Sequence, residues 1–326
     1  MGAACTAKDV KGQIMTERLT TAKVEDFIRD QLSDWQQAAD NYGALQTVRV
    51  KNIDVDGMHV RAQFNPARII SSSAKIDRKS LEDRKCFLCE ANRPSVQRSM
   101  LWRDRYSVLV NPFPIFPKHL TVVERSHCPQ SVSGRMDDMI SLAHELDGYT
   151  VFYNGPRCGA SAPDHMHFQA GNSDFLTLEE NLQKTSLAEI AESTGAKLMM
   201  CDRLPLKLFV IDSVDAAEGA KMFGRLADAM PYDRDSGEPM MNILSYSNGA
   251  GVRTVIVPRK RHRPSFYGTE GDGSMLISPA SVDMGGVFVL PRLEDFERFD
   301  AATVRKLYGE LCLNKSEITD IASNVK

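Results

Sequence analysis

Apolar residues recur along this chain with two periods, one typical of helices and the other of strands. Over residues 20–41 they return every three or four positions, behind a threonine that can cap a helix and ahead of Gly43 as a stop. This spacing predicts a helix there. The same pattern predicts further helices at residues 135–147, 178–194, 214–229 and 301–314.

Short apolar runs predict the strands. Two of them, at residues 45–53 and 58–64, flank Asp56-Gly57, a dipeptide typical of hairpin turns. Residues 65–85 are polar and basic and should form a long loop, whereas residues 112–117 are too rich in proline to join a central ladder. The other strands are expected at residues 106–111, 120–124, 149–154, 165–171, 197–203, 206–212, 241–247 and 252–258.

The order of these elements predicts an α+β protein with two lobes in close contact. A length of 326 residues fits about two domains or one large one. We expect an N-terminal leader and helix over residues 1–44, a first lobe over residues 45–196 and a second α+β lobe over residues 197–326. No glycine–serine linker separates the lobes, which favours close contact over independent domains.

Composition excludes several classes of protein. The net charge of −3 gives no polyelectrolyte character, so nucleic acid is not an expected partner. No apolar run approaches the roughly 20 residues that a membrane span needs, and the first residues lack the apolar core of a secretory signal. The seven cysteines are odd in number and irregularly spaced, which favours reduced thiols and a cytoplasmic location.

The strongest candidate for chemistry is a glycine-rich stretch followed by three polar residues at alternate positions. Those residues are His165, His167 and Gln169. Alternation is the period of a β-strand, so the three should project from one face while Met166 and Phe168 pack in a core on the other. This arrangement is typical of a reaction centre. The alternative is a half-buried strand whose histidines are merely satisfied polar residues.

Two imidazoles behind a flexible loop suit transfer chemistry at phosphorus. A neutral imidazole can attack phosphorus directly, which splits one difficult transfer into two easier ones. It needs its other ring nitrogen held, often by a backbone carbonyl, and it needs donors for the developing phosphate charge. The amide of Gln169 can donate to a phosphate oxygen. The loop can supply exposed N–H groups, so we expect phosphate contacts at Asn154, Gly155, Gly159 and Ser161.

Cys86 and Cys89 have the spacing of a zinc-binding pair. Two more ligands are needed, and His127 and His165 are the natural candidates. Four protein ligands would leave no open position, so the zinc would be structural and could hold the strand that bears His167. The alternatives for the cysteine pair are two thiols in a core or a redox dithiol.

Basic residues near these segments can meet the remaining phosphates. Arg68 and Lys118 are the preferred candidates, and Lys75 and Arg157 are others, although base rates favour a solvated surface charge over a ligand for each of them. The run Arg-Lys-Arg-His-Arg at residues 259–263 indicates either an anion-binding patch or an ordinary solvated turn.

These motifs resemble the signature of the histidine-triad (HIT) superfamily. The glutamine at the third position, Gln169, is typical of its transferase branch, because the hydrolase branch carries a third histidine there. Residues 111–120 are similar to a segment upstream of the triad, and residues 241–245 with 254–259 resemble the C-terminal segment of dinucleoside polyphosphate phosphorylases. The similarity touches most of residues 60–260. The branch comprises galactose-1-phosphate uridylyltransferase, diadenosine tetraphosphate phosphorylase and GDP-hexose phosphorylase, and the layout resembles an uncharacterised bacterial group related to these enzymes.

The resemblance implies a HIT-like antiparallel sheet with flanking helices and two related lobes. It also implies that His167 is the nucleophile that takes the nucleotidyl group and that Gln169 binds the same phosphate. In the uridylyltransferases a zinc is held by a Cys-x-x-Cys pair, a downstream histidine and the first histidine of the triad. The order of Cys86, Cys89, His127 and His165 matches that set. The chain departs from the pattern at Ala162 and at Asp164, where the uridylyltransferases have proline.

The implied activity is nucleotidyl transfer or phosphorolysis through a covalent nucleotidyl–His167 intermediate. The substrate would be a nucleoside diphosphate-sugar or a dinucleoside polyphosphate, with inorganic phosphate or a sugar phosphate as acceptor. One alternative is a zinc-dependent hydrolase in which His165 and His167 share a catalytic metal. Another is a non-catalytic nucleotide-binding protein. Members of the uridylyltransferase branch can share active sites across a dimer, so a homodimer is also open.

Overall fold

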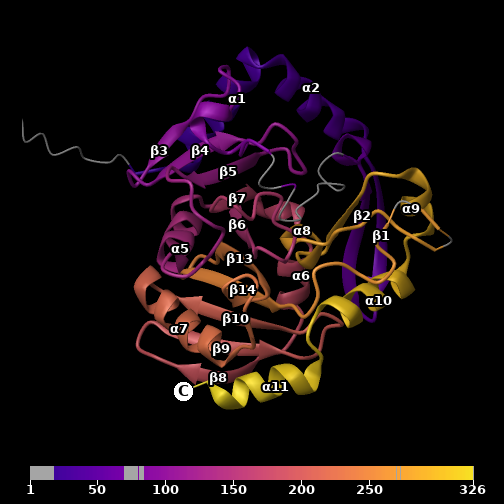
Figure 1. Cartoon of the computed structure of the whole chain (residues 1–326). Coiled ribbons are helices and arrows are strands. Elements are labelled where there is room, and N and C mark those ends of the chain that lie inside the picture. Colours follow the sequence, from indigo (N-terminus) through magenta and orange to yellow (C-terminus); the bar gives the residue numbers. More distant parts are fainter. Residues whose placement is uncertain (1–17, 70–79, 81–83, 269, 272, 326) are drawn as a thin grey trace, which may run out of the picture.

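A computed structural model describes residues 18–69, 80, 84–268, 270–271 and 273–325 (Figure 1). Within these residues ten strands form one sheet in which every pair of neighbours is antiparallel. Across the sheet the strands are β3 (Met100–Trp102), β4 (Tyr106–Val110), β5 (His119–Glu124), β7 (His167–Asn172), β6 (Tyr149–Asn154), β13 (Met241–Ser247), β14 (Val252–Pro258), β10 (Leu208–Ser213), β9 (Ala196–Cys201) and β8 (Ala188–Glu192).

Smaller sheets and helices complete the fold. β1 (Arg49–Val55), β2 (Met58–Phe64) and β15 (Val287–Leu290) form a three-stranded sheet in which β15 runs parallel to β2, and β11 (Tyr232–Asp233) pairs with β12 (Glu238–Pro239). The helices are α1 (Thr21–Asp34), α2 (Gln36–Ala44), α5 (Met136–Glu145), α6 (Leu178–Gln183), α7 (Ala216–Ala229), α8 (Ser281–Met284), α9 (Leu293–Arg298), α10 (Ala301–Leu311) and α11 (Lys315–Asn324).

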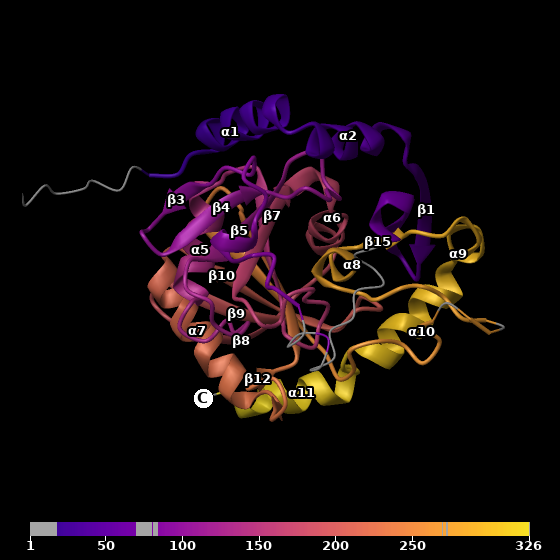
Figure 2. The same cartoon turned by 45° about the horizontal axis from the view of Figure 1, so that its top comes forward.

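The large sheet separates two apolar cores. One core joins α5, α7 and parts of α1 and α11 to the first face of the sheet, through residues such as Met139 and Leu226. The other joins the small sheet, α6, α8, α9 and α10 to the second face, through residues such as Phe288 and Leu307. Figure 2 shows α1 and α2 along one side of the molecule and α10 and α11 along the opposite side. The sheet is therefore covered on both faces, which buries its central strands.

The candidate motif lies on a central strand of this sheet. Met166 and Phe168 pack in the first core, as the alternating pattern predicts. His167 and Gln169 therefore face the other way, opposite Val123 and Thr121 of β5. His165 is not part of the predicted strand at residues 165–171, because β7 begins only at His167. It lies in the turn that leads into the strand.

Several predicted elements are confirmed, and the two predicted lobes share one sheet. The hairpin turn at Asp56-Gly57 is present, with both residues at positive φ, and the strand predicted at residues 149–154 is β6. β6 pairs with β13, so strands from residues 45–196 and 197–326 form a continuous ladder. The division of the chain at residue 196 stays a prediction.

Other predicted elements are wrong in their limits or type. The helix predicted at residues 20–41 is interrupted at Trp35, and α1 and α2 lie on either side of it. The helix predicted at residues 178–194 ends at Gln183, and residues 188–192 form the edge strand β8 because they pair with β9. Tertiary pairing overrides the helical propensity of its sequence Ala-Glu-Ile-Ala-Glu. The pattern missed β15, α8, α9 and α11.

In the part of the chain that the structure describes, no helix is both long enough and apolar enough to cross a bilayer.

Gly171 tests how tightly β7 is packed. An added Cβ there would come within 2.5 Å of the buried Phe116 ring, whereas nothing lies within 4 Å of an added Cβ at Gly224 in α7. Gly171→Ala should therefore lower the free energy of unfolding by about 1–3 kcal/mol through overpacking. Gly224→Ala should raise it by up to about 1 kcal/mol, because alanine favours a helix. Urea unfolding measures both, and equal effects of the two variants would contradict this packing.

Candidate active site and metal centre

His167 is held as a neutral base with one free nitrogen. Its Nδ1 lies 2.8 Å from the carbonyl oxygen of His165, so Nδ1–H donates to that carbonyl and Nε2 keeps its lone pair. Burial lowers the pKa of His167 to about 4. The ring is therefore uncharged at neutral pH. This is the arrangement that the sequence analysis required of a nucleophile.

Gln169 is oriented by a histidine on the neighbouring strand. The backbone N–H of Ile115 donates to Nδ1 of His119 over 3.2 Å, which places the ring proton on Nε2. That Nε2–H then donates to Oε1 of Gln169 over 2.9 Å. Burial, with the nearby charge of Arg68, lowers the pKa of His119 to about 3, so this tautomer is neutral. The oxygen of the Gln169 amide is occupied, and its NH₂ end is left to donate elsewhere.

The four predicted metal ligands lie together. Their donor atoms are all within 4.8 Å of one another. Nδ1 of His165 is 3.3 Å from Sγ of Cys86, and Nδ1 of His127 is 3.3 Å from Sγ of Cys89. Two thiols and two imidazoles at this spacing can hold a metal ion, and this donor set is typical of tetrahedral sites.

The ring of His165 is set for this role by the end of β5. Its Nε2 lies 2.7 Å from the carbonyl oxygen of Glu124, so Nε2–H donates and Nδ1 keeps a lone pair toward the cysteines. Because Nδ1 of His167 donates to a carbonyl instead, the two imidazoles face different partners. This geometry does not favour a hydrolytic metal shared by His165 and His167.

The glycine-rich loop is docked against the second half of the chain. Oδ1 of Asn154 accepts from the backbone N–H of Ser281 at 2.7 Å. An added Cβ would come within 2.8 Å of a carbonyl oxygen at Gly155 and within 2.5 Å of Ala280 at Gly159, where φ is +96°. Close packing therefore explains both glycines. The roles of Asn154, Gly155, Gly159 and Ser161 in phosphate binding stay predictions.

The preferred basic residues occupy different surroundings. Arg68 donates to the carbonyl oxygen of Phe113 at 2.6 Å, and its charge helps to lower the pKa of His119. Lys118 instead forms an ion pair with Glu25 of α1. Of the other candidates, Arg157 pairs with Asp233 and Asp235, and Lys75 lies outside the described residues.

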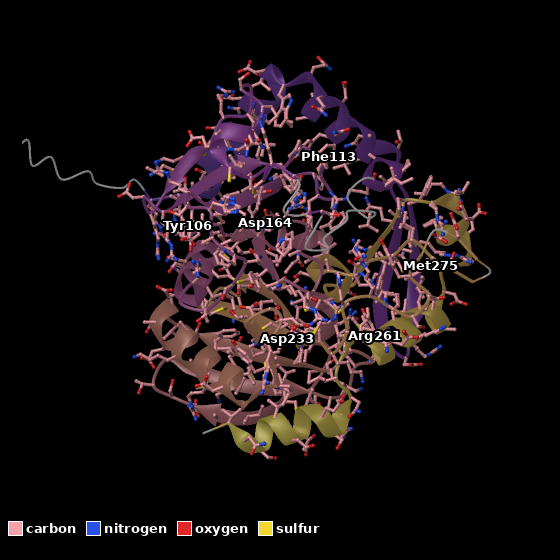
Figure 3. All side chains as sticks on the ribbon, viewed as in Figure 1. Tyr106, Phe113, Asp164, Asp233, Arg261 and Met275 are labelled. Atoms are coloured by element: carbon pink, nitrogen blue, oxygen red, sulfur yellow. The ribbon has the colours of Figure 1, made fainter. Side chains whose placement is uncertain are left out.

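The run at residues 259–263 behaves as a structural turn. Arg259 is only 4% exposed, and its guanidinium donates to Oδ1 of Asn242 and to three backbone carbonyls. Lys260 pairs with Glu317, and Arg261, labelled in Figure 3, pairs with Glu310. These partners favour the ordinary turn over the anion-binding patch.

Three residues near the site were missed by the sequence analysis. Arg84 pairs with Asp164, labelled in Figure 3, at 2.7 Å, and so fixes the residue directly before His165. Gln130 bonds the backbone of His167. His119 bonds Gln169, and its place in the segment at residues 111–120 was the one available signal.

Comparisons with known proteins concern the fold of the chain. The family model of a domain of unknown function, DUF4922, matches residues 27–172. No curated protein matches the chain. The yeast Ap4A phosphorylase Apa2, solved in complex with Ap4A, is 19% identical, with a TM-score of 0.56 over 85% of this chain and 96% of that one. The same enzyme in complex with AMP gives 18% identity and a TM-score of 0.53 over 85% and 94% of the two chains.

An ADP-glucose phosphorylase from Arabidopsis thaliana is a more distant likeness, at 14% identity and a TM-score of 0.37 over 79% of this chain and 99% of that one. The assignment of the fold rests on the yeast enzyme, with which the ten-stranded antiparallel sheet and its flanking helices agree. The chain therefore has the α+β, HIT-like fold that its motifs predict.

Proposed function

We propose that this protein is a nucleotidyltransferase of the phosphorylase type that works through a nucleotidyl–His167 intermediate. The observation that carries the proposal is the buried, neutral imidazole of His167, whose Nδ1–H is fixed on a carbonyl so that Nε2 is free to attack. The fold adds support, because the yeast Ap4A phosphorylase that shares it was solved with Ap4A and with AMP. The substrate class is a dinucleoside polyphosphate or a nucleoside diphosphate-sugar.

The reaction would proceed in two displacements at the same phosphorus. Nε2 of His167 forms a bond to the α-phosphorus while the bond to the leaving phosphate oxygen breaks and that oxygen keeps the electron pair. An oxygen of inorganic phosphate or of a sugar phosphate then attacks, and the P–N electron pair returns to Nε2. The imidazole is cationic while it carries the nucleotide, and the carbonyl of His165 stabilises that charge through Nδ1–H.

Two neighbours would bind the phosphate oxygens. Gln169 presents only NH₂ donors, since His119 occupies its oxygen, and such a donor stabilises charge as it develops on phosphorus. Arg68, whose charge acts on His119, could neutralise a second phosphate. We propose these contacts for Gln169 and Arg68; Lys118 is a weaker candidate because Glu25 neutralises it.

We further propose that the metal is a structural zinc. Cys86, Cys89, His127 and His165 provide four donors, so a tetrahedral ion would have no open position for substrate. The ion would tie the loop of the two cysteines to the turn that leads into β7. Binding requires both thiols to be reduced, which suits the cytoplasm.

The covalent intermediate can be tested directly. The protein would be incubated with substrates labelled with ³²P at the α-phosphate: a GDP-sugar, a UDP-sugar and Ap4A. We expect an acid-labile, base-stable label in the native protein and none in His167→Ala, because a phosphoramidate needs the imidazole nitrogen. His144→Ala, which changes an exposed histidine of α5, should label normally. Equal labelling of His167→Ala and the native protein would refute the mechanism.

The zinc can be tested by metal analysis. Cys86→Ser should lower bound zinc from about one per chain to a small fraction and should lower the melting temperature, because metal binding is coupled to folding. The matched control is Cys128→Ser. Cys128 adjoins His127, but its Sγ accepts from Arg135 and is not among the four clustered donors. If both variants retain the same zinc, the assignment is wrong.

The neutral state of His119 predicts a pH dependence of stability. Its pKa is about 3 in the folded protein and about 6.5 when unfolded, so between these values the unfolded chain binds the extra proton. Stability must therefore fall as the pH falls below 6.5. Between pH 7 and pH 5 the native protein should lose about 2 kcal/mol more than His119→Gln, measured by urea unfolding. Equal losses would mean that His119 is not held neutral.

A further inference from the structure

We propose that Gln130 is a positioning residue that fixes His167 for attack on phosphorus. The proposal rests on the proposed function for its catalytic consequence and on the hydrogen bonds of Gln130 for its geometry. Gln130 lies outside the strands and is only 1% exposed. It belongs to the segment that follows His127.

The ladder between β6 and β7 stops just before the nucleophile. Its register runs from Tyr149 opposite Asn172 to Phe152 opposite Gln169. Two residues further along each strand, the same register would place Asn154 opposite His167. That pair is absent from the ladder, although His167 remains paired with Val123 of β5 on its other side.

The side-chain amide of Gln130 fills this gap. Its Oε1 accepts from the backbone N–H of His167 at 2.9 Å. Its Nε2 donates to the carbonyl oxygen of Asn154 at 2.9 Å and to that of His167 at 3.1 Å. The amide therefore acts as one inserted peptide group that satisfies buried backbone atoms on both strands. The strands separate at His167 without leaving these polar groups unpaired.

The backbone around Gln130 holds this amide in place. The N–H of Gln130 donates to the carbonyl oxygen of Pro163 at 3.0 Å, and the N–H of Met166 donates to that of Cys128 at 2.8 Å. The hydrogen bond from Nδ1 to the carbonyl of His165 orients the His167 ring, so the position of its Nε2 depends on the backbone at both residues. Gln130 bonds the backbone of His167 and of Pro163 directly, and a small misplacement of a reacting atom has a large effect on rate.

Gln31 provides a matched control within the same chain. Its Oε1 accepts from the N–H of Arg98 at 2.6 Å, and its Nε2 donates to the carbonyl oxygen of Val96 at 2.9 Å. It is a fully buried glutamine, like Gln130, but it joins α1 to a loop and bonds no residue of β6 or β7. If the role of Gln130 were purely structural, replacing either glutamine would affect stability and the labelling of His167 in the same way.

The experiment compares Gln130→Met with Gln31→Met in the full-length protein. Methionine keeps a similar volume and removes the hydrogen bonds. We expect both to lower the melting temperature, but only Gln130→Met should slow labelling of His167 by the ³²P substrate, by about 100-fold with KM within about twofold. If Gln130→Met does not fold, Gln130→Glu is used, because it keeps the shape and the acceptor but loses the Nε2 donors. A folded Gln130 variant that labels at the native rate overturns the proposal.

A second readout needs no substrate. Histidine ¹⁵N shifts report which ring nitrogen carries the proton, with His167 assigned from its loss in His167→Ala. We expect a fixed Nδ1–H form in the native protein and in Gln31→Met, and a mixture of forms in the Gln130 variant. An unchanged spectrum in that variant overturns the positioning role. If the native protein takes no label, the proposed function fails. The positioning role is then judged by the spectra alone, and a shifted spectrum in the Gln130 variant but not in Gln31→Met still shows that Gln130 fixes the His167 ring.

Discussion

Backbone groups decide which nitrogen of each buried imidazole carries the proton, and the site depends on this constraint. The carbonyl of Glu124 fixes His165, the carbonyl of His165 fixes His167, and the N–H of Ile115 fixes His119. Each backbone bond leaves the opposite nitrogen with a defined role. One lone pair faces the thiols, one is free for attack, and one N–H holds Gln169. No ionised side chain is needed to set any of these tautomers.

Two adjacent strands provide this control. β5 contributes His119 at its first residue and the Glu124 carbonyl at its last, and β7 lies beside it with His167 and Gln169 directed away from the first core. The pairing of β5 with β7 thus sets the positions of His167 and Gln169 relative to His119 and to the Glu124 carbonyl. The metal cluster lies at the end of β5, where the carbonyl oxygen of Glu124 accepts from the His165 ring.

The sequence predicted the structure correctly where the pattern of residues lies within one short segment. Alternation placed Met166 and Phe168 in a core, and the spacing of Cys86 and Cys89 led to a four-group cluster that the fold brings together. Sequence-based prediction failed where a segment far along the chain determines which secondary structure forms. Residues 188–192 form a strand only because β9 pairs with them.

Long-range hydrogen bonds explain the residues that the sequence did not reveal. Gln130 and His167 are 37 residues apart, and His119 and Gln169 are 50 apart, so no local period marks either pair. The cluster at residues 259–263 shows the converse case. Its charges suggested a ligand site, but backbone carbonyls hold the buried Arg259, and the exposed Lys260 and Arg261 pair with carboxylates. Charge density in a sequence does not distinguish cations that bind a ligand from cations that pair with the protein's own groups.

The orientation of Gln169 also bears on which groups the proposed reaction can expel. Its oxygen accepts from His119, so its NH₂ end can donate hydrogen bonds, but no amide is acidic enough to transfer a proton to a leaving group. A leaving group that must be protonated as it departs would be poorly served at this position. Phosphate oxygens need no such help, because a terminal phosphate ester loses its second proton with a pKa near 6 and leaves as a stable anion. An amide at this position would therefore suit the proposed exchange between phosphate-terminated partners, which is the chemistry of a phosphorylase or a sugar-phosphate transferase.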